Sequence, residues 1–199
     1  FEPVVWFDSL HHAREPMGAE SLLLFADHVL TQAANGDEDA ERLLQTRQII
    51  FIPCSNPDGY EYNRQIAPGG GGMWRKNRRN NGGGVYGVDL NRNYDWEWGP
   101  QWGGSSGNAS SETYRGPSAA SEPEIQALVA LMAQHPPTFS VSAHTFSNMW
   151  LFPWGYTEIL TPDDELLRSL AAEIAAPGWI WGAPWQILYD ANGTNMDYH

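Results

Sequence analysis

An α/β fold, in the form of a mixed, largely parallel twisted sheet with helices on both faces, is predicted by three features of the sequence. Short apolar runs rich in β-branched and aromatic residues alternate with longer segments of helical spacing. The chain has 199 residues, of which 42% are hydrophobic, and this is enough to bury one substantial core. No run of about 18 apolar residues occurs, so no membrane span is expected. We therefore expect residues 1–199 to form a single domain.

The first half of the chain predicts two strands and two helices before a long loop. The β-prone run PVVWFDS predicts a strand at 4–8, and Pro16 suits the first turn of a helix at 17–34. A second helix is expected at 37–46, and QIIFIPC predicts a strand at 48–53. The stretch from 56 to 116 is rich in Gly, Asn and Trp, and loops of this length are usually functional. Its glycines form no G-x-G-x-x-G motif, so nucleotide binding is not supported.

In the second half, a capping box in SEPEIQALVALMAQ indicates a helix, predicted at 119–134. The run TFSVSAH predicts a strand at 138–143, and another strand at 149–152 and a helix at 163–176 complete the pattern. Cys54 is the only cysteine, which excludes an internal disulfide, and we expect it to pack as a small buried hydrophobe.

Charge is distributed unevenly along the sequence. The net charge is −13, yet seven of the eleven basic residues fall between positions 64 and 115. A local positive potential in an acidic body is consistent with attraction of an anionic chain end. The acidic chain lacks the basic face that nucleic-acid binding requires, so no nucleic acid is expected as a partner.

The strongest functional signal is a candidate zinc site formed by His12 and Glu15 in LHHAREP and His144 in SVSAHTF. Catalytic zinc sites use three protein ligands and leave the fourth position to water. A His-x-x-Glu alone often matches by chance, but this one lies between a predicted strand and a predicted helix. Because His144 also follows a strand, two strand ends can bring all three ligands to one edge of a sheet.

Seven motifs follow one another in the order and chemistry of one known family. They are LHHAREP, SNPDGYEYN, WRKNRRN, VDLNRNYDW, SSETYRGPSAASEPE, SAHTFSNMWLFPWGY and LYDANGTNMDY. Over nearly its whole length the chain resembles the zinc carboxypeptidase A/T family, and it looks most similar to the bacterial carboxypeptidase T branch. The resemblance implies one zinc ion bound by His12, Glu15 and His144. It also implies hydrolysis of the C-terminal residue of a peptide by a metal-activated water.

The same resemblance assigns roles around the reacting carbonyl and the chain end. Arg75 matches the arginine that polarises the scissile carbonyl, whereas Lys76, Arg78 and Arg79 read as a basic surface loop. Asn91 and Arg92 match the pair that grips the terminal carboxylate, for which a guanidinium fork is a suited partner. Asp89 matches a carboxylate that steadies the first histidine ligand, although an ordinary loop or capping aspartate is the alternative.

Two more positions bear on substrate binding. Tyr189 matches a mobile tyrosine that closes over bound substrate, and a buried core tyrosine is the competing interpretation. Met196 falls at the position that sets preference for the terminal side chain in this family. Because Met is apolar and adaptable, the resemblance implies a preference for hydrophobic termini. Asp190 and Asp197 leave room for a broader specificity.

One expected residue is absent from the chain. The family's general base is a glutamate on a strand downstream of the tyrosine loop, and this chain reaches Tyr198 and His199 first. The family also has further elements before the segment that matches PVVWFDS. We therefore expect a partial catalytic domain, incomplete at both ends, that binds zinc but is a weak catalyst alone.

Two rival functions remain open at this point. One is a carboxypeptidase of the same chemistry that acts on bacterial cell-wall peptides. The other is a catalytically inactive module that binds C-terminal carboxylates. The resemblance also implies a secreted or periplasmic protein, and the sequence has no signal peptide in view. We expect a monomer whose partner is the C-terminus of a peptide or protein, without membrane attachment.

Overall fold

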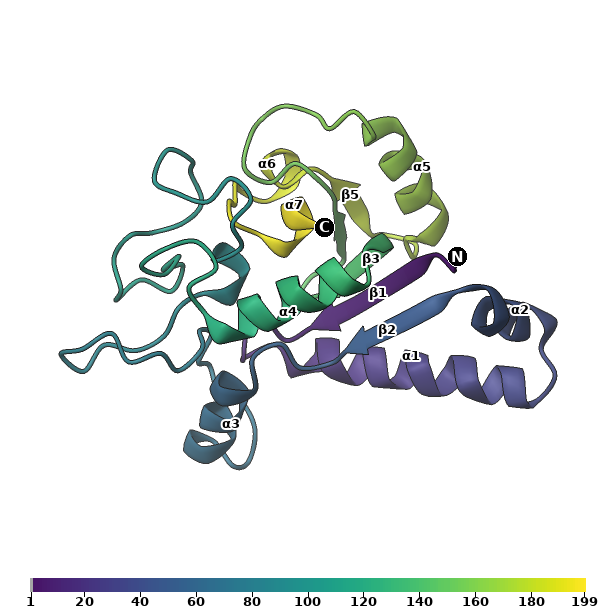
Figure 1. Cartoon of the computed structure of the whole chain (residues 1–199), viewed down its shortest axis with the longest axis horizontal. Coiled ribbons are helices and arrows are strands. Elements are labelled where there is room, and N and C mark those ends of the chain that lie inside the picture. The colour runs from purple at the N-terminus through teal and green to yellow at the C-terminus, as the bar shows by residue number, and fades with distance from the viewer. Residues whose placement is uncertain (1) are drawn as a thin grey trace. The chain divides into compact units, whose positions relative to one another are not determined.

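The computed structural model describes residues 2–199 and confirms the α/β class (Figure 1). By its internal contacts the chain forms two compact units. Unit 1 contains the residues up to Asn77 together with Gln126–Thr145, and unit 2 contains Arg78–Ile125 together with Phe146–His199. The prediction of one domain over 1–199 stays a prediction.

Unit 1 is built on a three-stranded parallel sheet with the order β2-β1-β3. Its strands are β1 (Val4–Ser9), β2 (Gln48–Ile52) and β3 (Pro137–Ala143), and all three were predicted to within a residue or so. Both neighbours pair with β1 in parallel. The segments that leave β1 and β3 therefore start from the same edge of the sheet.

The central strand β1 packs on both of its faces. Val4, Trp6 and Asp8 are buried on one face, as the two-residue period of a strand requires. On the other face the Phe7 ring stacks on Phe51 at 5.1 Å between centroids and meets Phe25 edge-on at 5.3 Å. Burial on both faces explains why this segment reads as a continuous apolar run.

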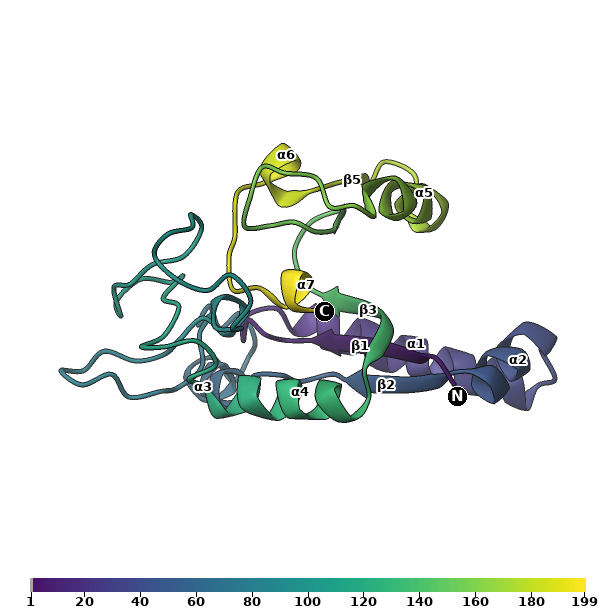
Figure 2. The ribbon, with the colours of Figure 1, turned by 45° about the horizontal axis from the view of Figure 1, so that its top comes forward.

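Four helices belong wholly or mainly to unit 1: α1 (Pro16–Ala34), α2 (Glu38–Thr46), α3 (Pro57–Ile66) and α4 (Pro123–Gln134). In unit 1, α1 packs on β1 and β3, and the two ribbon views show α1 and α4 on opposite faces of the sheet (Figures 1 and 2). Helices α1 and α2 match the prediction closely. Helix α4 begins at Pro123, four residues later than expected.

Helix α3 corrects the prediction of one uninterrupted loop from 56 to 116. The Asn56 side chain accepts a hydrogen bond from Gly59 N at 3.0 Å, and Pro57 occupies the first turn. Gly59 is needed there because a Cβ would lie 2.5 Å from the Lys76 carbonyl oxygen. The expectation of a buried Cys54 is also wrong, since Cys54 is exposed just before this helix.

Unit 2 has short elements joined by long connections. They are η1 (Leu90–Arg92), β4 (Met149–Leu151), α5 (Asp164–Ile174), β5 (Ile180–Gly182), α6 (Pro184–Ile187) and α7 (Asn195–Tyr198). Strands β4 and β5 pair in parallel, and α5 and α6 pack on β5. The strand and helix predicted at 149–152 and 163–176 correspond to β4 and α5. Within residues 2–199, every helix is too short or too polar to cross a membrane.

Candidate functional site

The turn between β1 and α1 positions the first two candidate ligands in unit 1. After β1 ends at Ser9, Leu10 adopts a left-handed backbone with φ of 60° and is almost fully buried, which turns the chain toward His12. Pro16 begins α1, and Glu15 precedes it without capping the helix through its side chain. The carboxylate therefore lies at the positive end of the helix, a place that favours its charged form.

The candidate ligand atoms from β1–α1 and from the end of β3 converge in unit 1. Glu15 Oε1 lies 2.8 Å from His12 Nδ1, and Glu15 Oε2 lies 2.8 Å from His144 Nδ1. The two histidine nitrogens are 3.2 Å apart. Taken together, one ligand atom from each residue lies within 4.8 Å of the others. The predicted meeting of the three side chains at one sheet edge is thus what the structure shows.

This donor set fits a zinc ion. Two neutral imidazole nitrogens and a carboxylate would direct lone pairs at one another unless a proton or a cation lay among them. Zinc takes histidine nitrogen and carboxylate oxygen and needs three protein ligands in a catalytic site. His12 and Glu15 are buried, while the His144 side chain is 31% exposed, so the group is reached from solvent on the His144 side.

Electrostatics keeps Glu15 ionised. Burial alone would raise the pKa of this carboxyl, but the hydrogen bonds with His12 and His144 outweigh it and hold the pKa far below its usual range. An ionised carboxylate is the form that binds a metal ion. Glu15 is therefore ready to act as a ligand without losing a proton.

Arg75 lies in the same unit as the three candidate ligands. It is buried, with 6% exposure, and its carbonyl oxygen accepts a hydrogen bond from Ala13 N at 2.9 Å. That bond joins the backbone of Arg75 to the residue that follows His12. The neighbouring Lys76 is also buried, with its ammonium 5.9 Å from the centre of the Trp74 ring. The interpretation of Lys76 as part of a basic surface loop is therefore wrong.

The residues assigned to the terminal carboxylate lie in and beside η1 of unit 2. Asp89 caps η1 by accepting a hydrogen bond from Asn91 N at 3.0 Å, which is the capping role kept open as an alternative. Arg92 donates from Nε to Gly104 O at 2.8 Å and from Nη1 to Asn91 O at 2.5 Å. These bonds fix the guanidinium in place. Each Nη group carries two hydrogens, so a carboxylate can still bind to the fork.

The C-terminal segment of unit 2 packs against η1. Asn91 Oδ1 accepts a hydrogen bond from Asn195 N at 3.0 Å, and Asn195 Oδ1 accepts one from Met196 N at 2.9 Å. Met196 is half-buried against Gly155, where an added Cβ would lie 2.8 Å from its Cε atom. Tyr189 is 51% exposed, which excludes the buried core tyrosine considered as its alternative.

Asp197 is an acid whose burial the sequence did not predict. Its Oδ1 accepts a hydrogen bond from Gly155 N at 2.8 Å, and its own N–H donates to Thr194 Oγ1. Burial raises the pKa of this carboxyl to about 6, against an ordinary 3.8, despite these hydrogen bonds and the charge of Arg92. The sequence tied Asp197 to specificity only through its charge and gave no sign of its burial.

We expect Asp197→Asn to stabilise the protein near pH 7 by up to about 3 kcal/mol, the free-energy equivalent of a pKa of about 6 in place of 3.8. In the parent protein the folded state holds the Asp197 proton more tightly than the unfolded state does. The stability that this proton contributes to the parent is complete below about pH 4 and is lost as the pH rises through about 6. The gain of the amide variant should therefore vanish below about pH 4 in urea unfolding curves.

The exposed Asp27→Asn, which also removes one charge, is the matched control and should leave the pH profile unchanged. Parallel stability profiles for Asp197→Asn and the parent protein would contradict the expected result.

Several known proteins are similar to this chain over nearly its whole length. The sequence model of the zinc carboxypeptidase family matches residues 1–196. A metallocarboxypeptidase A-like protein of Trichophyton verrucosum is 31% identical over 99% of this chain and 47% of its own length. Human carboxypeptidase A1 is 32% identical over 98% of the chain and 47% of its own length. The crystal structure of carboxypeptidase A from Helicoverpa armigera superposes with a TM-score of 0.80 at 29% identity, over 99% of this chain and 49% of that one.

The comparisons also show how much of its relatives the chain covers. It spans about half the length of the curated relatives described above. They bear out the resemblance to the family seen in the sequence motifs. The finer similarity to the carboxypeptidase T branch stays a prediction.

Proposed function

Since the chain belongs to the zinc carboxypeptidase family, we propose that its protein is a metallocarboxypeptidase that removes the C-terminal residue of peptides, with zinc held by His12, Glu15 and His144. The family uses one zinc ion. The observation that carries the proposal is the convergence of two imidazole nitrogens and an ionised carboxylate within 4.8 Å of one another. The chain spans only about half of its relatives, so the activity is proposed for the whole protein.

The chain's own residues would support the reaction in distinct ways. Bound zinc would supply a water of lowered pKa and polarise the scissile carbonyl. Glu15 enters the site already ionised, and Arg75 would stabilise the negative charge that develops on the carbonyl oxygen. The role of Asp89 as the acceptor that orients His12 stays a prediction.

Recognition of the chain end is assigned to unit 2. Asn91 and Arg92 would bind the terminal carboxylate, because the buried Arg92 is held by two backbone carbonyls and its guanidinium has more N–H groups than these two bonds use. The exposed Tyr189 would close over the substrate. A carboxylate-binding pair is what would restrict cleavage to the last residue of a peptide.

A preference for hydrophobic C-terminal residues is the finer part of the proposal. Met196 presents an apolar side chain, so peptides ending in Phe should be cleaved with kcat/KM about tenfold or more above those ending in Lys. Met196→Asp should reverse or erase this ratio, and Met196→Leu, which keeps an apolar side chain of similar volume, should preserve it. A strong preference of the parent protein for Lys would overturn this assignment.

The decisive test of the function is hydrolysis of a blocked dipeptide ending in Phe by the zinc-loaded protein as its gene encodes it. Release of free Phe supports the proposal. Tight binding of the dipeptide without release would instead support a non-catalytic carboxylate-binding module. Turnover confined to cell-wall peptide fragments would identify the rival substrate class. A secreted or periplasmic location also stays a proposal.

A further inference from the structure

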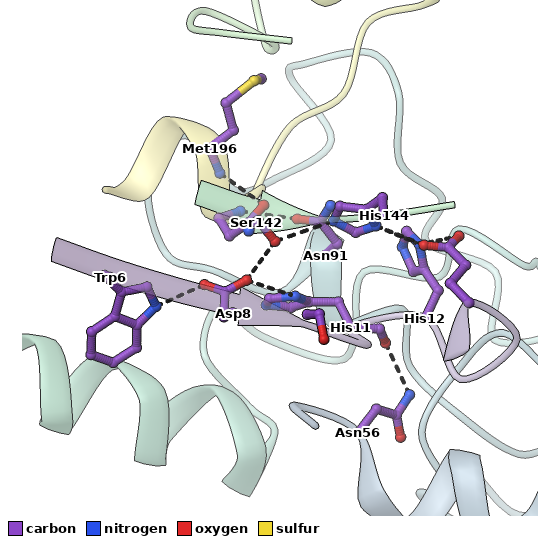
Figure 3. A network of polar contacts seen from close by, with 12 residues as sticks. Trp6, Asp8, His11, His12, Asn56, Asn91, Ser142, His144 and Met196 are labelled. Atoms are coloured by element: carbon purple, nitrogen blue, oxygen red, sulfur yellow. Dashed lines mark hydrogen bonds and ion pairs between the residues drawn. The ribbon is translucent and has the colours of Figure 1, made fainter. Parts of the chain in front are cut away.

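A second polar cluster lies in unit 1 beside the candidate zinc ligands (Figure 3). Asp8, on β1, is fully buried and accepts hydrogen bonds on both of its oxygens. Trp6 Nε1 donates to Oδ2 at 2.8 Å, and Ser142 Oγ donates to Oδ1 at 2.5 Å. His11 Nδ1 lies 3.5 Å from Oδ1 as well. A buried carboxylate with this many donors is held in one orientation.

The sheet register explains why these side chains meet. Asp8 and Ser142 are direct partners across the parallel pair of β1 and β3. Side chains alternate along a strand, so Trp6 lies on the same face as Asp8, and Ser140 on the same face as Ser142. His144 follows Ser142 by two residues, just beyond the end of β3. The register therefore links a buried acid of β1 to a candidate ligand that follows β3.

The link continues from Ser142 to the ring of His144. Ser142 Oγ lies 3.5 Å from His144 Nε2, while the opposite ring nitrogen, Nδ1, faces Glu15 and His12. The single hydroxyl hydrogen of Ser142 is directed to Asp8. Its oxygen can then only accept from His144, which requires a hydrogen on Nε2 and leaves Nδ1 as the unprotonated ligand atom.

We propose that Asp8, acting through Ser142, is a positioning residue that fixes the tautomer and orientation of His144 for zinc. This inference rests on the proposed function, in which His144 is a ligand. A carboxylate behind a metal-bound histidine commonly raises its basicity and aims its ring. Here the Asp8 carboxylate acts through the Ser142 hydroxyl, which the sheet register places between Asp8 and His144. We call this connection from Asp8 through Ser142 to His144 the relay.

Replacing the Asp8 carboxylate with an amide is expected to reverse the direction of the hydrogen bonds in the relay. A carboxylate accepts on both oxygens, whereas the amide of Asp8→Asn accepts on one side and donates on the other. If its NH₂ group faces Ser142, the serine must accept there and turn its hydrogen toward His144 Nε2. That arrangement favours a proton on Nδ1, the atom that zinc needs.

The experiment measures Zn²⁺ affinity by chelator competition in the protein as its gene encodes it, together with the visible absorption of the Co²⁺-loaded form. Ser142→Ala and Asp8→Asn should each weaken Zn²⁺ binding by about 10- to 100-fold and alter the Co²⁺ spectrum. Ser140→Ala is the matched control, because it makes the same change two residues earlier on the same strand. It should stay within about twofold of the parent affinity.

Two further variants show whether a loss of Zn²⁺ affinity comes from the relay, from a less stable fold or from a wrong ligand assignment. Trp6→Phe removes the donor to the other oxygen of Asp8 and should lower stability while leaving Zn²⁺ affinity within about twofold. An equal loss of affinity in Trp6→Phe and Asp8→Asn would overturn the relay. His144→Ala tests the ligand assignment: if it binds Zn²⁺ as the parent does, the proposed metal site fails. If it loses Zn²⁺ and Ser142→Ala does not, only the relay fails.

Discussion

Glu15→Gln is expected to lower Zn²⁺ affinity by more than about 100-fold and to abolish peptide hydrolysis. This loss is larger than that expected when a residue that only hydrogen-bonds a ligand is replaced. The substitution keeps the shape of the side chain but removes the charge that His12 and His144 stabilise. A neutral amide in this buried position offers zinc a weaker oxygen and leaves two histidines without their anion. Zinc content after dialysis and chelator competition would measure the loss.

The matched control is Glu20→Gln, the same change five residues later, at an exposed position on α1. It should retain full zinc content. If Glu15→Gln held one zinc ion as tightly as the parent protein, the ligand set proposed for this chain would be wrong. Thermal unfolding of both variants would show whether the fold is retained.

Arg75→Ala is expected to reduce kcat by about 100- to 1000-fold, the usual effect of removing one preorganised oxyanion donor. Zinc content should stay that of the parent, because Arg75 is not in the ligand group. Arg75→Lys should recover only part of the rate, since an ammonium cannot reproduce the planar fork of a guanidinium. The measurement is steady-state hydrolysis of the Phe-terminated dipeptide at matched zinc loading.

The exposed Arg64→Ala, which breaks a surface ion pair with Glu61, provides the control for loss of one positive charge. It should leave kcat within about twofold of the parent value. A normal kcat in Arg75→Ala would remove this residue from the proposed chemistry. A shift confined to KM would reassign it to ground-state binding of substrate.

The sequence predicted the elements whose signals are local and periodic. β1 and α1 were found because a β-prone run, Pro16 and helical apolar spacing lie within a few residues of one another. The meeting of His12 and His144 also followed from sequence, since both lie just past strands that parallel pairing brings side by side. The assigned roles of Arg75, Asn91 and Arg92 came instead from resemblance.

What the sequence did not reveal depends on partners that are far apart along the chain. Lys76 looked like one more charge in a basic run, and its burial follows from packing around Trp74 and α3. Asp197 is hydrogen-bonded to Gly155, some forty residues earlier, so no local pattern predicted its burial. Ser142 carried one faint signal, its place two residues before His144, but its partner Asp8 is set by sheet register.

The parallel pairing of β1 with β3 has a consequence for how the protein acquires its metal. More than a hundred residues separate Glu15 from His144, so an unfolded polypeptide would have to close a very large loop to present both donors. Ion capture is thus coupled to completion of the central sheet, and the ion in turn stabilises only the assembled state. A chain whose β1 and β3 had not paired would therefore hold the metal ion poorly.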